Sequence, residues 1–114
     1  MTDSKTLVRE IVKVLDEKKA MNIVAIETEE VTIVSDFFVI ASGMSLADDV
    51  EYEIKKRLGI DPEHIEGRAT GWILLDYGSV IVHVFQQESR EYYNLERLWT
   101  DAKVFDISDI LTQD

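Results

Sequence analysis

The chain has 114 residues, of which 46% are apolar, a share that suits one globular domain and is too large for a disordered segment. It contains no cysteine, so disulfides, thiol catalysis and cysteine-ligated metal sites are excluded. The 23 acidic residues outnumber the 12 basic ones, and the net charge of −11 disfavours binding to a DNA or RNA backbone. The acidity instead favours a basic protein partner, or it serves solubility alone.

Targeting and membrane segments are absent from the sequence pattern. The first residues, Met1–Lys5, form neither an apolar stretch nor an Arg-rich one, so they resemble neither a secretory signal nor a transit peptide. No run of about 18 apolar residues occurs, which predicts no membrane span. We therefore expect a cytoplasmic protein without a membrane partner, formed by a single domain over residues 1–114.

Apolar periodicity predicts a helix at the start of the chain, followed by extended segments. The helix is capped by Thr2 or Asp3, runs to about Lys19 and has one apolar stripe. The β-branched segment Asn22–Thr28 predicts a strand. Val31–Val34 either extends the first strand or forms another one. The nearly continuous apolar run Asp36–Ser42 predicts a strand covered on both faces.

Capping residues predict where the second helix begins and ends. Gly43 ends the second long strand, and Ser45 is the expected N-cap of a helix, with Asp48 completing a variant of the capping box. Gly59 is the expected stop of that helix.

The second half of the chain contains a strong hairpin pattern. Ile65–Arg68 predicts a short edge strand, and Trp72–Tyr77 and Val80–Gln86 predict two longer strands. Gly78 and Ser79 between them form the expected two-residue turn, with glycine first.

The last predicted elements complete the fold class. Ser89 is expected to cap a helix that runs to about Trp99, and Val104–Leu111 is expected to be a short appended segment. The resulting order of helices and strands predicts an α/β (α+β) fold, with a single mixed sheet and helices mainly on one face. The strand-to-helix junction at Ser45 suggests one parallel crossover.

Side-chain alternation in the hairpin predicts two different faces. With Tyr77 opposite Val80, pairing continues outward until Trp72 lies opposite Phe85. The face expected to pack on the core holds Ile73, Leu75, Tyr77, Val80, Val82 and Val84. The mixed face holds Trp72, Leu74, Asp76, Ile81, His83 and Phe85. Aromatic residues around a few polar ones are typical of an interface, although a covered face with His83 and Asp76 satisfied internally fits the composition equally well.

Catalytic patterns are weak. A Ser/His/Asp set could be drawn from Ser45, His83 and Asp76, but many chains offer three such residues. Gly43 and Ser45 could bind phosphate at the helix start, as in nucleotidyl-transfer enzymes, which also need two carboxylates on one strand. The hairpin has only Asp76, so capping is the preferred role of Ser45. We expect no catalytic residues, no metal and no cofactor.

Three motifs resemble the Iojap family, the ribosomal silencing factors. They are Ser35–Ser45, then Glu66–Gly67 with Trp72–Phe85, and finally Arg90–Trp99. They occur in the family's order and spacing, within a resemblance that covers about residues 5–105. The pair Asp48-Asp49 departs from the family's pattern at the start of the second helix.

The resemblance implies a nucleotidyltransferase-like topology without the catalytic carboxylates, and a protein that is not an enzyme. It implies a repressor that binds the large ribosomal subunit at the basic ribosomal protein named L-fourteen. There it blocks joining of the small subunit when nutrients are short. One alternative is a large-subunit assembly factor that uses the same surface, and another is a nucleotidyltransferase-like enzyme.

The resemblance also implies a docking surface in the Trp72–Phe85 motif. The partner-binding residues expected there are Trp72, Leu74, Asp76, Tyr77, His83 and Phe85. An aromatic face of this kind could also pair with itself about a two-fold axis, which would give a homodimer when the ribosome is absent. No direct DNA contact is expected.

Overall fold

The computed structural model describes residues 3–28, 36–43, 45–67, 71–86 and 103–111. These residues contain two helices and six strands. The elements are α1 (Ser4–Glu17), β1 (Met21–Glu27), β2 (Phe37–Ser42), α2 (Leu46–Leu58), β3 (His64–Glu66), β4 (Trp72–Asp76), β5 (Val80–Phe85) and β6 (Lys103–Phe105).

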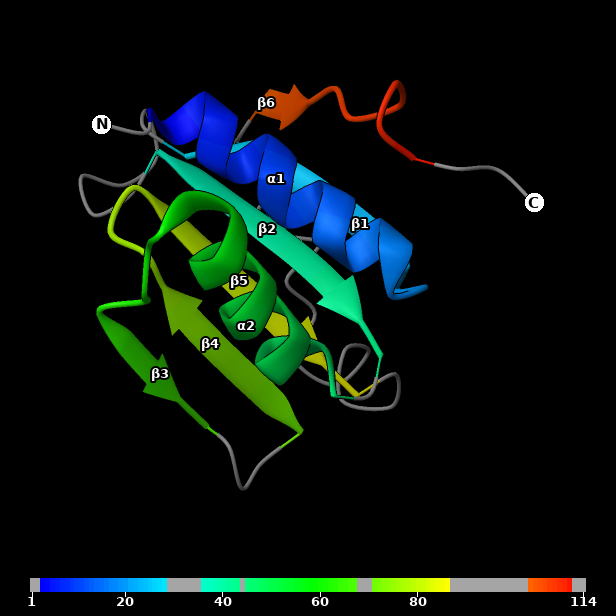
Figure 1. The fold of residues 1–114 in the computed structure, drawn as a ribbon. Helices are drawn as coiled ribbons and strands as arrows, with labels where there is room; N and C mark the ends of the chain where they lie inside the picture. The colour runs from blue at the N-terminus through cyan, green and yellow to red at the C-terminus, as the bar shows by residue number, and fades with distance from the viewer. Residues whose placement is uncertain (1–2, 29–35, 44, 68–70, 87–102, 112–114) are drawn as a thin grey trace.

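The six strands form one mixed sheet in the order β3-β4-β5-β2-β1-β6. The central neighbours β2 and β5 are parallel, and every other pair is antiparallel. Both described helices lie on the same face of the sheet (Figure 1). The predicted fold class is confirmed, as is the parallel crossover that passes through the strand-to-helix junction after β2.

Helix α1 begins at a side-chain cap and buries one apolar stripe. The Asp3 carboxylate accepts the backbone N–H of Thr6 at 2.7 Å, which satisfies one of the free donors at the helix start. The buried stripe consists of Leu7, Val8, Ile11, Val12, Val14 and Leu15. The predicted helix is confirmed, with ends one or two residues inside the expected ones.

The start of α2 differs from its predicted geometry. Ser45 has a left-handed backbone with φ 60°, and its side chain makes no capping hydrogen bond to the described helix. Ser45 therefore occupies the N-cap position, as predicted, but the predicted side-chain cap is wrong, because a capping side chain needs an extended backbone to reach the second or third N–H of the helix. The predicted stop is confirmed, because Gly59 has φ 72° and donates its N–H to the carbonyl of Lys55 at 2.9 Å.

The hairpin has the register that alternation predicts. Trp72 lies opposite Phe85, and Asp76 lies opposite Ile81. The Tyr77 N–H donates to the Val80 carbonyl at 2.9 Å, and Gly78 has φ 87°, a conformation that glycine adopts without strain.

The two edges of the sheet depart from expectation in detail. Strand β3 begins at His64 rather than Ile65 and pairs with β4 as the predicted edge strand. Strand β6 was missed, because residues 104–111 were expected to form only an appended segment, whereas Lys103–Phe105 pairs with β1. The predictions for residues 31–34 and 89–99 lie outside the described residues.

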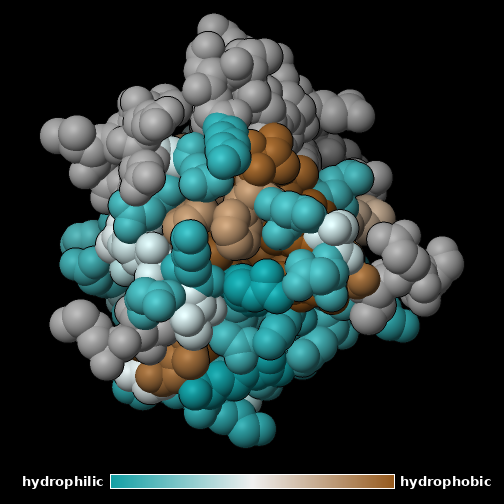
Figure 2. Space-filling model, turned by 90° about the horizontal axis from the view of Figure 1, so that it is seen from above, coloured by the Kyte–Doolittle hydropathy of each residue, from teal (hydrophilic) through white to brown (hydrophobic). Residues whose placement is uncertain are grey.

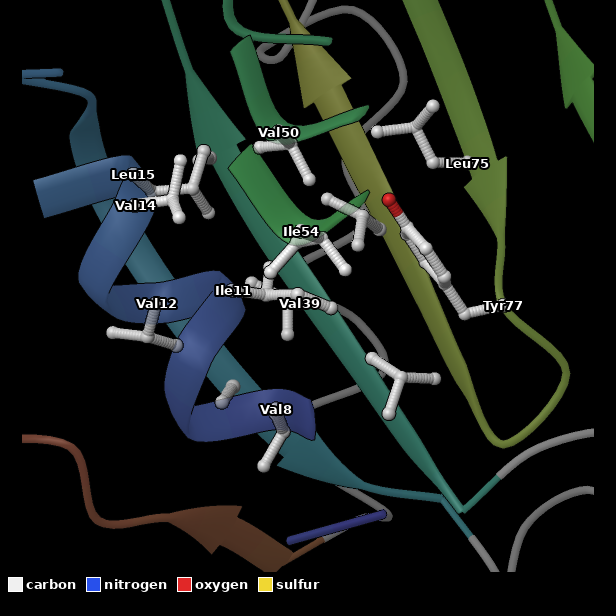
Figure 3. Close-up of a cluster of buried hydrophobic side chains, with 14 of the residues drawn as sticks. Val8, Ile11, Val12, Val14, Leu15, Val39, Val50, Ile54, Leu75 and Tyr77 are labelled. Atoms are coloured by element: carbon white, nitrogen blue, oxygen red, sulfur yellow. The ribbon is translucent and has the colours of Figure 1, made fainter. Parts of the chain in front are cut away.

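The core lies between the helices and the sheet (Figure 3). Helix α1 contributes Ile11 and Leu15, and helix α2 contributes Val50 and Ile54, all fully buried. The hairpin contributes Leu75, Tyr77, Val80, Val82 and Val84, with Ile73 packed against the same cluster. This is the face that alternation assigned to the core, so that assignment is confirmed.

Candidate docking surface

The other face of the sheet, called here the second face, carries the mixed set of the hairpin. Strand register adds side chains from the remaining strands to it. Its members are Val24, Ile26, Phe38, Ile40, Ser42, His64, Glu66, Trp72, Leu74, Asp76, Ile81, His83, Phe85 and Val104. On β5 all positions of this face are buried, and on β1 and β2 Ile26 and Ile40 are buried whereas Val24 and Phe38 are half-buried. The positions on β3, β4 and β6 are half-buried or exposed.

The accessible side chains of this face on β3 and β4 are called here the β3–β4 patch. It consists of Trp72, Leu74 and Asp76, which are half-buried, together with His64 and Glu66, which are exposed. In the register of the two strands, His64 lies opposite Asp76, and Glu66 lies opposite Leu74. The patch therefore has an aromatic and aliphatic centre with carboxylates beside it.

Three of the six predicted docking residues are not accessible. His83 is 4% exposed and Phe85 is 0% exposed, so both lie beneath the surface of the second face. Tyr77 is 7% exposed and lies on the helix face, among the core side chains of Figure 3. Its placement follows from alternation, since residues 73, 75 and 77 point to the same side. Burial raises the pKa of the Tyr77 phenol. The structure thus narrows the predicted docking side chains to the three on β4.

Trp72 is held by two aromatic neighbours on β5. Its ring stacks on Phe85, with centroids 5.2 Å apart and an interplanar angle of 21°. Its Nε1–H donates to Nδ1 of His83 at 3.1 Å. The His83 ring in turn meets Phe38 of β2 edge-on, with centroids 4.7 Å apart. One face of the indole is therefore covered and its only polar atom is directed inward.

Burial controls the charge of His83. It lowers the pKa of the imidazole to about 4, so the ring is neutral at pH 7. Since Nδ1 accepts the Trp72 N–H, the single proton of the neutral ring is on Nε2. That Nε2 atom is buried and makes no hydrogen bond within the described part of the chain.

Asp76 is oriented by the hairpin turn. Its Oδ1 accepts the N–H of Gly78 at 2.8 Å, and its carbonyl accepts the N–H of Glu63 at 2.7 Å. The idea that Asp76 and His83 are satisfied internally is thus correct for one carboxylate oxygen and one ring nitrogen. It does not remove Asp76 from the surface, because the residue stays half-buried.

The surroundings of the patch are acidic. Glu66 is exposed on β3, and Glu63 is exposed just before it. Asp61 is also exposed, but its carboxylate pairs with Lys55 of α2 at 2.9 Å, on the helix side of the sheet. Elsewhere, the described surface seen from above is mostly hydrophilic, with hydrophobic residues showing in smaller areas (Figure 2). A basic partner would meet carboxylates around an apolar centre at the β3–β4 patch.

A cavity of about 150 Å³ lies where β2 leads into α2. It is lined by Gly43, Ser45, Leu46, Ala47, Asp48, Gly71, Ile73, Val84, Phe85 and Gln86. The lining is largely apolar, contains a carboxylate and, among the described residues, includes no basic side chain. Such a lining does not favour a phosphate group.

The Ser/His/Asp set considered for catalysis is not brought together. Ser45 lines the cavity at the Phe85 end of the hairpin, whereas Asp76 lies opposite Ile81, beside the turn. In the described ranges, no three His, Asp or Glu side chains gather into a potential metal site. None of the described helices is long and apolar enough to cross a membrane.

Comparison with protein families identifies the class to which this chain belongs. The family model described as "Ribosomal silencing factor during starvation" matches residues 1–114. The chain belongs to this family, and the resemblance drawn from the three motifs is confirmed.

Individual relatives cover most of the chain. A protein of Halalkalibacterium halodurans named "Ribosomal silencing factor RsfS" is 36% identical over 107 residues, which are 89% of this chain and 92% of the relative. A protein of the same name from Bacillus subtilis is 36% identical over 111 residues, covering 92% of this chain and 94% of the relative. The mouse protein "Mitochondrial assembly of ribosomal large subunit protein 1" is 36% identical over 99 residues, which are 79% of this chain and 43% of that protein.

Two solved structures share the fold. A crystal structure of a protein from Chromobacterium violaceum matches with a TM-score of 0.79 at 28% identity, covering 87% of this chain and 88% of that one. A crystal structure of a protein from Bacillus halodurans matches with a TM-score of 0.74 at 33% identity, covering 90% and 99% of the two chains.

Sequence reasoning missed the contact between Trp72 and His83. In the predicted register His83 lies opposite Leu74, which makes it the diagonal neighbour of Trp72 on the same face. Diagonal neighbours in antiparallel strands lie within reach of aromatic side chains, so the register contained the signal.

Proposed function

We propose that this protein binds the large ribosomal subunit through the β3–β4 patch and thereby prevents the small subunit from joining. The partner on that subunit is a basic ribosomal protein, the one named L-fourteen in the family resemblance. The mechanism is occupancy, which requires affinity and no chemistry. In the cytoplasm of a starved cell, this would repress translation.

The observation that carries the proposal is the composition of the patch. Trp72 and Leu74 give it an apolar centre, and Asp76 and Glu66 lie beside them. Tryptophan is among the residues that most often dominate binding energy at interfaces. The net charge of −11 complements a basic partner and speeds its approach. Membership of the silencing factor family supports the choice of the ribosome as partner.

A second candidate function is assembly of the large subunit. It is favoured by the 36% identity to the mouse protein whose name states that role for the mitochondrial ribosome. The same patch would serve both functions, because each requires docking on the large subunit. When no ribosome is present, the patch could instead pair with a second copy of the chain, a state that sedimentation velocity would detect.

The decisive experiment measures binding to isolated large ribosomal subunits by co-sedimentation. Trp72→Ala should weaken binding about thirtyfold to a thousandfold, as truncation of a central interface residue costs roughly 2–4 kcal/mol. The matched control is Tyr52→Ala, which removes a 66% exposed aromatic side chain from α2, away from the patch. Normal binding by a folded Trp72→Ala protein would refute the proposed docking surface.

A second assay separates silencing from assembly. Small subunits are added to large subunits that carry the bound protein, and joined ribosomes are separated by density gradient. Silencing by occupancy predicts fewer joined ribosomes with the wild-type chain and Tyr52→Ala, and normal joining with Trp72→Ala. Full joining in the presence of bound wild-type protein would rule out the silencing mechanism and leave the assembly role.

A further inference from the structure

The indole N–H of Trp72 poses a problem for any docking surface built on this residue. A tryptophan N–H that loses contact with water needs another acceptor, or the group is left unsatisfied at a cost in binding. Here the acceptor is already inside the protein, since Nδ1 of His83 accepts this N–H at 3.1 Å. The partner therefore meets a tryptophan whose polar atom is already satisfied.

The polar side chain of His83 is energetically unfavourable at its buried position. Its side chain is 4% exposed and its buried Nε2 makes no hydrogen bond to a described residue. Its neighbours along the second face of β5, Ile81 and Phe85, are apolar and buried. A residue needed only for packing there would carry no polar atoms, because an unsatisfied buried donor destabilises the fold.

Contacts on two sides fix the orientation of the imidazole. Phe38 of β2 meets it edge-on, at a centroid distance of 4.7 Å and an interplanar angle of 64°. Trp72 of β4 lies on the other side, with ring centroids 5.8 Å apart. Nδ1 is thus held where it accepts the indole N–H, and the Phe85 ring stacks on the indole.

We propose that His83 is a positioning residue for docking, which orients Trp72 and satisfies its N–H so that the indole can be buried against the partner without a new acceptor. This inference rests on the proposed function of the β3–β4 patch. His83 itself touches no partner, in contrast with its predicted role as a contact residue.

The test uses two replacements of His83. In His83→Asn the Oδ1 atom occupies the place of Nδ1 and keeps an acceptor for the indole. His83→Phe keeps a ring of similar size and removes the acceptor. We expect His83→Asn to bind large subunits nearly as well as wild type, and His83→Phe to bind about tenfold to a hundredfold more weakly.

The wild-type chain provides a test that does not depend on the folding of a variant. Long-range ¹H–¹⁵N spectra report which ring nitrogen of His83 carries the proton, and we expect Nε2. The indole N–H signal of Trp72, assigned with Trp72→Phe, should shift strongly in His83→Phe and little in His83→Asn. A proton on Nδ1 in the wild-type chain would overturn the inference.

The outcomes distinguish this inference from the proposed function. If folded His83→Phe binds subunits normally while Trp72→Ala does not, the patch stands and the positioning role of His83 is wrong. If Trp72→Ala binds normally, the patch itself is wrong, whatever the spectra of His83 show. Equal weakening by His83→Asn and His83→Phe would contradict the acceptor role.

Discussion

Acidification should destabilise this protein through His83 at a pH where most proteins lose little of their free energy of unfolding. Burial lowers the pKa of His83 to about 4 in the folded chain, whereas the imidazole of an unfolded chain has a pKa of about 6.5. At a pH between these two pKa values, the imidazole binds a proton in the unfolded state but not in the folded state. Stability is therefore complete above the unfolded pKa and falls as the pH drops toward 4. The lost free energy of unfolding is about 2 kcal/mol at pH 5 and about 3 kcal/mol near pH 4.

Two ion-paired carboxylates lose their contributions to stability below that window. A hydrogen bond from Arg57 lowers the pKa of Glu17, and one from Arg9 lowers the pKa of Asp109. Their contributions are lost only when the pH falls through those lowered values, so a measurement between pH 5 and 7.5 reports mainly on His83.

Urea unfolding followed by circular dichroism across this pH range gives the required free energies. We expect His83→Asn to remove most of the pH dependence, because asparagine does not titrate. His64→Asn is the matched control, since it removes an exposed histidine from β3, and it should keep the wild-type dependence. If His83→Asn shows the same pH dependence as wild type, the burial of a neutral imidazole is not its cause.

Three further predictions follow from the two faces, the helix starts and the charge. Leu75→Ala should lower the free energy of unfolding by about 2–5 kcal/mol through a buried cavity, and Trp72→Ala should lower it less. Equal losses in urea melts would contradict the assignment of the faces. Asp3→Ala should lower the free energy of unfolding, whereas Ser45→Ala should leave it nearly unchanged, because of the two only Asp3 caps its helix with its side chain. A larger loss at Ser45 would mean that it caps after all. Association with large subunits, measured by stopped flow, should slow as the salt concentration rises. A rate independent of salt would mean that the acidic residues serve solubility and do not speed binding.

Local pattern was sufficient to predict the hairpin and the first helix. A two-residue turn at Gly78 fixes which residues lie opposite, and period-two alternation then assigns each side chain to a face. The apolar stripe of α1 was equally clear because it repeats at helical spacing from Leu7 to Leu15. Strand β6 was not predictable in this way, since three residues are too few for a period and its partner β1 lies far away in the sequence.

The burial of each side chain in the candidate site was harder to predict than the face of the sheet on which it lies. Alternation placed His83 and Phe85 on the same face as Trp72, but it does not say which strand lies at the centre of the sheet. Alternation therefore left open whether both residues are buried, and the central place of β5 between β4 and β2 is set by long-range pairing. The left-handed backbone of Ser45 was not predictable either, because the residue type favoured a side-chain cap with an extended backbone.

The position of β5 also governs when the sheet can form during synthesis. This strand joins β4 to β2, yet it consists of residues 80–85, in the last third of the chain. Until it emerges from the ribosome, β2 and β4 each expose an unpaired, largely apolar edge, which is the kind of edge that promotes aggregation. A nascent chain that stalls before residue 80 therefore has no sheet centre on which to fold. For a protein proposed to act on ribosomes, complete translation is thus a condition for its own folding.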